Sequence, residues 1–315
     1  MKWRVTMPAL RIKVTGACNR TCHFCHEEGD MRGIDSVQPD TPFLECVTAL
    51  RDATGIDRVM FSGGEPTIHP AILDLVACVS APLMSLTSNG ITLHDEDWWR
   101  RARTAGLSKV IFSVHDATVQ SFQALESTPR AAGWALRGLN AQQANIINAD
   151  KAGISVRANV VVYDGADNAL RVIKMLRALP VALEIRLLND LSNVVQTKRE
   201  IDAVCAVLEA THVGTERRAG TSNVSTQMRG SDGFMFSVKL SYPYFFDAVC
   251  GSCTMKSECL EGFYGLRLER RGGEYTVRLC IYKQTADLLM PWREFLQTDL
   301  AARMRDLYRS ELEKT

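Results

Sequence analysis

Three cysteines lie within eight residues near the start of the chain, in the stretch CNRTCHFC. They are Cys18, Cys22 and Cys25, separated by three residues and then by two. Structural zinc sites use four ligands, usually as two separated pairs, so three thiolates in one loop do not complete such a site. A cluster of four irons held by three cysteines keeps one iron open to bind another molecule. The spacing therefore predicts an iron–sulfur cluster with one reactive position, and the alternative is a zinc or redox loop.

Four more cysteines gather near the end of the chain, at Cys250, Cys253, Cys259 and Cys280. Clustered cysteines in a long chain without an export signal indicate metal binding rather than disulfides. A small zinc ribbon is the alternative for this second group. The three remaining cysteines lie in apolar stretches with helical spacing and are interpreted as packing residues: Cys46, Cys78 and Cys205.

The composition fits a globular protein of 315 residues, with 46% apolar and 23% charged residues. The net charge of +1 argues against nucleic acid or an anionic membrane as a partner. The sequence has no run of eighteen apolar residues, and its start lacks the apolar core of a signal peptide. We therefore expect a cytoplasmic protein.

Six apolar or β-branched runs alternate with helical patterns up to about residue 210. These predicted strands are Leu10–Thr15, Arg58–Gly63, Leu83–Ser88, Lys109–Val114, Ile154–Val162 and Leu183–Leu188. Repeated strand–helix units predict an α/β fold with a parallel sheet, closed or nearly closed like a barrel. Chemistry in such folds gathers at the carboxyl ends of the strands. The first cysteine loop follows the first strand directly, which places it at this edge.

The composition changes at about residue 211, so we predict two domains, 1–210 and 211–315. Residues 211–233 are rich in Gly, Ser and Thr and are interpreted as a linker with loops. Residues 234–245 and 266–280 have strand-like patterns, the second with a Gly-Gly turn. The tail from residue 285 has helical spacing and good helix formers.

Two motifs together carry a family resemblance. Phe24 precedes the third cysteine of the first loop, and Gly63-Gly64-Glu65-Pro66 follows the second predicted strand. The chain resembles the radical S-adenosylmethionine (SAM) enzymes. In that family the open iron binds the amino and carboxylate groups of SAM, and electron transfer releases a 5′-deoxyadenosyl radical that abstracts a substrate hydrogen atom. The resemblance implies an enzyme with a partial (β/α)6 barrel.

The same resemblance implies a set of residues that contact SAM. Glu65 would be the carboxylate near the methionine ammonium, and Asn159 lies where a ribose contact is expected. Each polar residue taken alone would more often be a strand-end cap. The implied cofactor-binding set is Phe24, Gly63, Gly64, Glu65, Ser88, Ser113 and Asn159.

The C-terminal part resembles the auxiliary-cluster domains of the twitch and SPASM subfamilies. The similarity is greatest to the GTP 3′,8-cyclase family, also called molybdenum cofactor biosynthesis protein A-like. The matching stretches are LRIKVTGACNRTCHFC, FSGGEP, TSNG, RANVVVYDGADN and CGSC…GLRLERRGGEYTVRLC. Position by position, this implies two 4Fe–4S clusters, the second held by Cys250, Cys253 and Cys280. It also implies that substrate is bound by Arg11, Arg186 and Arg267.

Two departures separate the chain from that family. Cys259 lies in an apparent insertion after Cys253, and the chain ends in ELEKT instead of the Gly-Gly tail of the cyclases. We expect Cys259 to be the fourth ligand of the auxiliary cluster, because soft thiolates favour iron–sulfur clusters. Substrate would then not coordinate that cluster, and the product would differ from the molybdopterin precursor.

The predicted reaction is hydrogen abstraction from a small, nucleotide- or sugar-like molecule, with flavodoxin or ferredoxin as the reductant. The candidate catalytic residues are His115, just past the fourth strand, together with Arg11 and Arg186. One alternative is a peptide-modifying maturase, for which a separate protein would supply leader binding. The other alternative is a zinc or iron–sulfur interaction module without catalysis.

Overall fold

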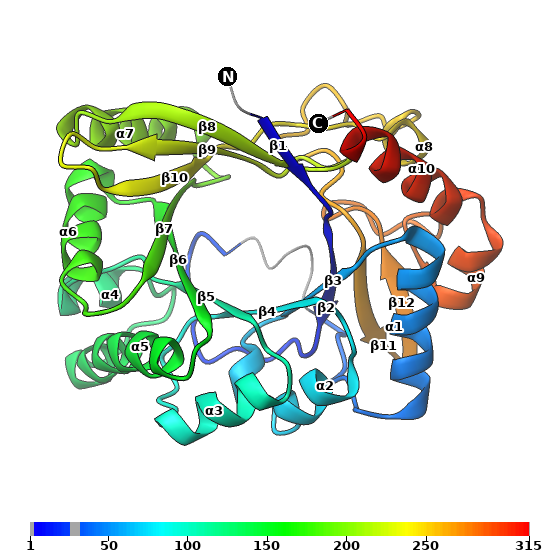
Figure 1. Cartoon of the computed structure of the whole chain (residues 1–315), viewed down its shortest axis with the longest axis horizontal. Coiled ribbons are helices and arrows are strands. Elements are labelled where there is room, and N and C mark those ends of the chain that lie inside the picture. The colour runs from blue at the N-terminus through cyan, green and yellow to red at the C-terminus, as the bar shows by residue number, and fades with distance from the viewer. Residues whose placement is uncertain (1–2, 26–31, 315) are drawn as a thin grey trace.

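A single curled sheet organises the computed structural model of the chain, which describes residues 3–25 and 32–314. Within these residues, thirteen strands pair in the order β1-β8-β9-β10-β7-β6-β5-β4-β3-β2-β11-β12-β13. The six central strands run parallel in chain order. They are β2 (Ala9–Lys13), β3 (Arg58–Ser62), β4 (Leu83–Ser88), β5 (Lys109–Ser113), β6 (Ser155–Val162) and β7 (Leu183–Asn189). All six predicted strands are confirmed, and the sheet curls into a partial barrel (Figure 1).

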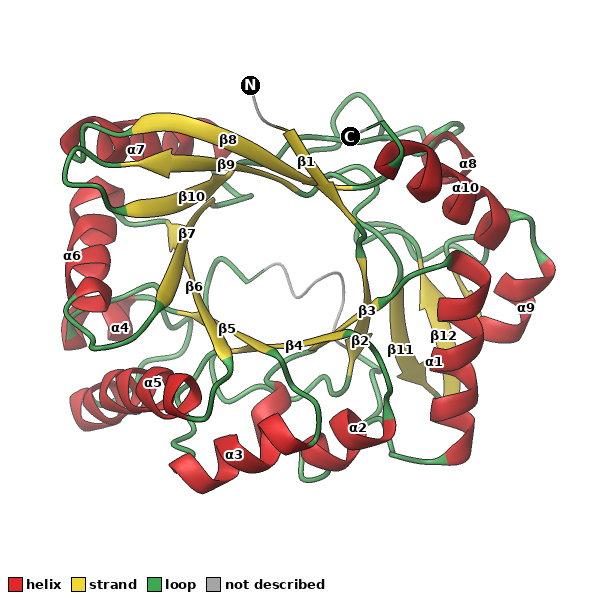
Figure 2. Cartoon of the chain, in the orientation of Figure 1, coloured by secondary structure: helices red, strands yellow, loops and turns green. Residues whose placement is uncertain are grey.

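The helices between these strands lie on the outside of the curl (Figure 2). They are α1 (Thr41–Thr54), α2 (Ile72–Cys78), α3 (Glu96–Thr104), α4 (Val119–Ala124), α5 (Ala132–Lys151), α6 (Gly165–Arg177) and α7 (Val194–Val207). Local sequence sets their ends: α1 begins where the Asp40 side chain accepts a hydrogen bond from the Phe43 amide, and it ends at Gly55, whose φ is +73°.

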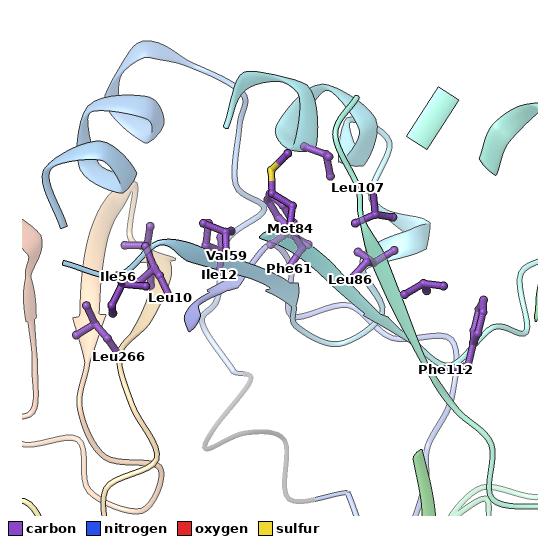
Figure 3. Packing of buried hydrophobic residues seen from close by; sticks show 14 of the residues in the cluster. Leu10, Ile12, Ile56, Val59, Phe61, Met84, Leu86, Leu107, Phe112 and Leu266 are labelled. Carbon is purple, nitrogen blue, oxygen red and sulfur yellow. The ribbon is translucent and has the colours of Figure 1, made fainter. Parts of the chain in front are cut away.

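Alternation along the strands separates two faces of the sheet. Leu10, Ile12, Val59, Phe61 and Leu86 are almost fully buried and pack beneath the helices (Figure 3). Successive side chains of a strand point to opposite faces. The intervening residues therefore point to the concave face, and they are mostly polar or charged. The concave face is the surface on which a site can form.

Both edges of the parallel core are extended by strands of the C-terminal half of the chain and, on one side, by the N-terminal strand β1. Beyond β7 lie β10 (Met235–Lys239), β9 (Val224–Arg229), β8 (Thr211–Arg218) and then β1 (Trp3–Thr6). Beyond β2 lie β11 (Arg267–Arg271), β12 (Glu274–Arg278) and β13 (Leu289–Pro291). Strands from both sides of residue 210 thus belong to one sheet, and the division into two domains there stays a prediction.

The interpretation of residues 211–233 as a linker is wrong, because they contain β8 and β9. These strands are polar and largely exposed or half-buried, so they lack the apolar alternation that reveals a strand. Their stability comes from pairing: β8 is parallel to β1 and antiparallel to β9. The predicted helical tail is confirmed from residue 292 by α9 (Trp292–Gln297) and α10 (Leu300–Leu312), whereas residues 285–291 are not helical and include a short strand. The remaining helix is α8 (Asp247–Cys250), and a short 3-10 turn, η1, covers Pro66–Ile68.

None of the described helices has the length and hydropathy that crossing a bilayer requires.

A buried ionic cluster ties β2 to the C-terminal hairpin. The Glu269 carboxylate lies 3.3 Å from Lys13 Nζ and 3.6 Å from Arg278, and all three side chains are fully buried. Arg271 Nε also lies 2.5 Å from Glu269 Oε1. One carboxylate therefore balances cations from three strands, β2, β11 and β12.

We predict that Glu269→Gln lowers the free energy of unfolding of the metal-free protein by about 3–5 kcal/mol, since it leaves buried cations without their counter-charge. Urea unfolding followed by circular dichroism measures this loss. Glu96→Gln is the matched control, because Glu96 forms an exposed pair with Arg100 and should cost less than about 1 kcal/mol. Equal effects of the two substitutions would contradict the structural role of the cluster.

Candidate functional site

The first cysteine loop leaves β2 and lies against the end of β3. Backbone hydrogen bonds of 2.8 Å run from Gly64 N to the Thr15 carbonyl and from Glu65 N to the Ala17 carbonyl. A Cβ at Gly63 would lie 2.4 Å from the Thr15 oxygen, and one at Gly64 would lie 2.1 Å from the Ala17 oxygen. Both glycines are therefore required by the close approach of the cysteine loop itself.

The three thiols of this loop lie close enough to influence one another electrostatically. Cys18 and Cys25 are exposed and Cys22 is half-buried. Burial raises the pKa of Cys18, and it raises that of Cys22 to about 12, so both thiols are protonated at neutral pH until a metal displaces the proton. Cys18 Sγ accepts from the Arg20 amide at 3.5 Å and from Asn89 Nδ2 at 3.8 Å. Neighbouring thiols with N–H donors fit an iron–sulfur cluster.

Within residues 3–25 and 32–314, no three His, Cys, Asp or Glu side chains converge closely enough to form a metal site as they stand. The assignment of Cys18, Cys22 and Cys25 as iron ligands therefore stays a prediction.

Arg20 and Glu126 clamp the middle of the cysteine loop. Arg20 Nε lies 2.7 Å from Glu126 Oε1, and Glu126 Oε2 accepts from the Thr21 amide at 2.8 Å and from its hydroxyl at 3.1 Å. The guanidinium also stacks over Phe122 at 4.0 Å and lies 3.8 Å from Asp116. Sequence reasoning missed this clamp. The only signal was an arginine between two predicted iron ligands, where ligation does not need one.

Phe24 packs on His115, which lies just after β5. The ring centroids are 5.0 Å apart, and Phe24 also lies 5.2 Å from Tyr163. His115 Nδ1 accepts a hydrogen bond from the Val161 amide, which puts the ring proton on Nε2. Desolvation by burial, helped by Arg20, lowers the pKa of His115 to about 3, so the ring is neutral. Its catalytic role stays a prediction, and its visible contact is with the cysteine loop.

The Glu65 carboxylate joins the ends of β3 and β4. It is buried and accepts from the Thr67 amide at 2.9 Å, the Thr67 hydroxyl at 2.6 Å, the Ser88 hydroxyl at 2.8 Å and the Asn89 amide at 2.6 Å. Burial raises its pKa, while these four donors act in the opposite direction. A carboxylate has about four acceptor positions. Three of the four donors bind Oε1 and one binds Oε2, so the carboxylate holds the loops together while Oε2 can still accept from a cofactor, and the role of Glu65 as a SAM contact stays a prediction.

A row of polar residues crosses the concave face from β5 to β10. Ser113, Asn159, Arg186 and Ser237 are successive partners across these strands. Asn159 Oδ1 is buried and has no hydrogen-bond partner within the described residues, so it is available to a polar ligand. Arg186 Nε donates to Ser237 Oγ at 3.4 Å. Burial lowers the pKa of Arg186 to about 9, which leaves it charged at neutral pH.

Two of the predicted substrate-binding arginines meet beside a residue that sequence reasoning missed. The Arg11 and Arg267 guanidinium groups lie 5.0 and 5.2 Å from the ring centre of Tyr264. Lys239, from the end of β10, donates to the Tyr264 hydroxyl at 2.6 Å. Arg186 also interacts electrostatically with this phenol. The structure therefore brings the three predicted arginines into one region.

The second cysteine group also comes together. All four thiols are half-buried, and Cys250 interacts electrostatically with Cys253, Cys259 and Cys280. Cys259 Sγ accepts from the Gly262 amide at 3.1 Å, and Cys280 Sγ accepts from the Lys283 amide at 3.4 Å. Cys259 thus lies with the three cysteines implied by the family resemblance, and the binding of iron by this group stays a prediction.

Residues 12–169 match the Radical SAM superfamily, which is 158 of the 315 residues. A protein of Pyrococcus abyssi named Probable GTP 3′,8-cyclase is 34% identical over 107 residues, covering 33% of this chain and 34% of that protein. A protein of the same name from Pyrobaculum aerophilum is 30% identical over 192 residues, covering 58% of each chain. The chain therefore spans between about a third and three-fifths of these relatives.

Among solved structures, the chain is similar to SuiB of Streptococcus suis, in a crystal structure bound to S-adenosylmethionine. The TM-score is 0.55 over 97% of this chain and 66% of SuiB, with 14% sequence identity. At this identity the similarity concerns the fold alone, and it agrees with the partial barrel seen here.

We predict that Glu65→Ala lowers the stability of the cofactor-free protein by about 1–3 kcal/mol, because it leaves buried donors from Thr67 and Ser88 unpaired. Urea unfolding without iron or SAM measures the loss, and SAM affinity should fall as well once the cluster is present. Glu45→Ala, in the exposed part of α1, is the control. Unchanged stability with weakened SAM binding would instead make Glu65 a direct cofactor ligand.

Proposed function

Because this chain belongs to the radical SAM superfamily and is an enzyme of that family, we propose that it abstracts a hydrogen atom from a nucleotide- or sugar-like small molecule. The family implies a 4Fe–4S cluster and SAM as cofactors, together with a small-molecule substrate and a reductant. The observation that supports this proposal best is that a three-thiol loop follows β2, the parallel strand that also carries Arg11 of the cationic concave face.

In the proposal, the cluster is held by Cys18, Cys22 and Cys25. When bound, the cluster and SAM supply a 5′-deoxyadenosyl radical. The chain holds the loop still through the Arg20–Glu126 pair, while Phe24 covers it from the side of His115. Asn159 Oδ1, unpaired within the described residues, would accept a hydrogen bond from a ribose hydroxyl, while Ser113 and Ser88 end the next two strands on one side of it, β5 and β4.

The charge of the concave face supports an anionic or hydroxyl-rich substrate. Arg267 is 2% exposed and Arg186 is 8% exposed, so both guanidinium groups have lost most of their hydration. Their electrostatic partners of opposite charge are the Tyr264 phenol, the Cys280 thiol and three carboxylates, Glu216, Glu261 and Glu269. Buried cations are stabilised by a paired anion. A phosphate or carboxylate of the substrate would supply further negative charge beside Arg186 and Arg267.

We further propose that the second cysteine group holds a second 4Fe–4S cluster, with all four thiolates of Cys250, Cys253, Cys259 and Cys280 as ligands. The amide donors to Cys259 and Cys280 support this, since N–H groups commonly stabilise cluster sulfurs. Such a cluster has no open iron, so it would carry electrons rather than bind substrate. A flavodoxin or a ferredoxin is the proposed reductant.

Cys22→Ala should abolish reductive cleavage of SAM, because no other described thiol lies in a position to replace this ligand. The measurement is anaerobic formation of 5′-deoxyadenosine with dithionite, with and without a panel of ribonucleotides and sugar phosphates. In the wild type, the true substrate should raise the rate. Cys205→Ala, in α7, is the matched control and should behave as the wild type. Undiminished 5′-deoxyadenosine from Cys22→Ala would refute the first cluster assignment.

The auxiliary cluster is isolated by replacing Cys18, Cys22 and Cys25 together by Ala. This protein should keep about four of about eight irons. Added ¹³C-cyanide should show no hyperfine coupling to the remaining cluster, since four thiolates leave no open iron. Adding Cys259→Ala should create that coupling. Coupling already present before Cys259 is replaced would mean that the auxiliary iron is open and that Cys259 is not its ligand.

A further inference from the structure

Tyr264 occupies an unusual position on the concave face, in the short loop that leads into β11. Its neighbours Phe263 and Leu266 are buried in the core, so the loop is fixed in place. Tyr264 as a whole residue is half-buried, in contrast to these two neighbours. It connects the two sides of the parallel core, because Lys239 comes from β10, next to β7, while Arg11 and Arg267 come from β2 and β11 on the other side.

Four cations surround this one phenol. Lys239 Nζ lies 2.6 Å from the hydroxyl and 4.4 Å from the ring centre. Arg11 and Arg267 lie over the ring, and Arg186 on β7 contributes at longer range. The nearby anion is Glu261, in the same loop. Cations over a ring would be satisfied by phenylalanine as well, so the ring contacts alone do not explain a tyrosine.

The hydroxyl oxygen accepts a hydrogen bond from Lys239, and it has no other hydrogen-bond partner within the described part of the chain. Lys239 can only donate, so the phenol's own proton has no acceptor there. Burial and the nearby Glu261 carboxylate raise the pKa of Tyr264. The positive charges of Lys239 and Arg11 lower it by more, so the pKa is about 8. The geometry therefore favours loss of this proton near neutral pH.

We propose that Tyr264 and Lys239 form the acid–base pair of the site, in which the phenolate of Tyr264 takes one proton from a hydroxyl group of the substrate. This proposal rests on the proposed hydrogen abstraction, because a hydroxyl on a carbon that has lost a hydrogen atom is far more acidic than an ordinary alcohol. The substrate O–H bond breaks and the phenol O–H bond forms. The negative charge moves to the substrate oxygen, where Arg11 and Arg267 stabilise it, and no electron is transferred.

The test uses the metal-free full chain, so it is independent of SAM cleavage. Absorbance at 295 nm follows tyrosine ionisation between pH 6 and 11. One of the seven tyrosines should titrate with a midpoint near 8. Tyr264→Phe should remove this step, and Lys239→Met should move it upward by about one pH unit or more. Tyr242→Phe is the control, because Tyr242 is 67% exposed, and it should leave the step unchanged.

A second measurement tests whether the Tyr264 phenolate is accessible from the site, as a base must be, or is buried and only structural. N-acetylimidazole acetylates accessible phenolates, and peptide mapping gives the rate at each tyrosine. Tyr264 should react fast at pH 8, more slowly in Lys239→Met, and the fully buried Tyr308 should not react. The proposal is overturned if no tyrosine titrates below pH 9.5, if the step persists in Tyr264→Phe, or if Tyr264 titrates but is not acetylated. None of these outcomes affects whether the loaded enzyme cleaves SAM.

Discussion

The contact on which the site depends is the backbone approach between the cysteine loop and the end of β3. A side chain at residue 64 would bring its Cβ to 2.1 Å from the Ala17 oxygen, so only glycine fits. This approach hydrogen-bonds Glu65 to the loop and turns its carboxylate toward the end of β4. There it receives the amide of Asn89, whose side chain reaches back to Cys18 Sγ at 3.8 Å. The GGEP motif and the cysteine motif are thus two halves of one structure.

Buried positive charge has two different roles in this fold. Lys13 and Arg278 are fully buried, and both form ion pairs with the Glu269 carboxylate. These ion pairs hold β2, β11 and β12 together. Arg186 and Arg267 on the concave face form no ion pair with a carboxylate of the described residues; their electrostatic partners include the Tyr264 phenol and the acids Glu216, Glu261 and Glu269. A ligand anion can therefore compete for the second set without weakening the first. That second set is Arg186 and Arg267.

Strict alternation made most of the barrel predictable from sequence, because each parallel strand is covered by helices and buries every second residue. The same reasoning failed for β8 and β9, whose polar residues are held by strand pairing instead of core packing. The two groups of candidate metal-binding cysteines could also be predicted, because the spacing of cysteines is a local feature of the sequence. The contacts that support the site could not be predicted. Arg20 and Glu126 are 106 residues apart, and Lys239 contacts Tyr264 only because the sheet curls. Contacts between distant elements leave no local pattern to read.

The two cysteine groups are far apart in sequence, and strand β2 connects them because it pairs with β11. It leads into the loop of Cys18, and it pairs with β11 so that Arg11 lies beside Arg267. β11 in turn pairs with β12, which leads directly to Cys280, and Arg278 Nε donates to the Cys280 carbonyl at 2.9 Å. A shift of β11 against β2 would therefore displace the cation cluster and both cysteine groups together. The buried ionic cluster around Glu269 lies at this junction, so stability of the sheet and alignment of the site are the same physical requirement.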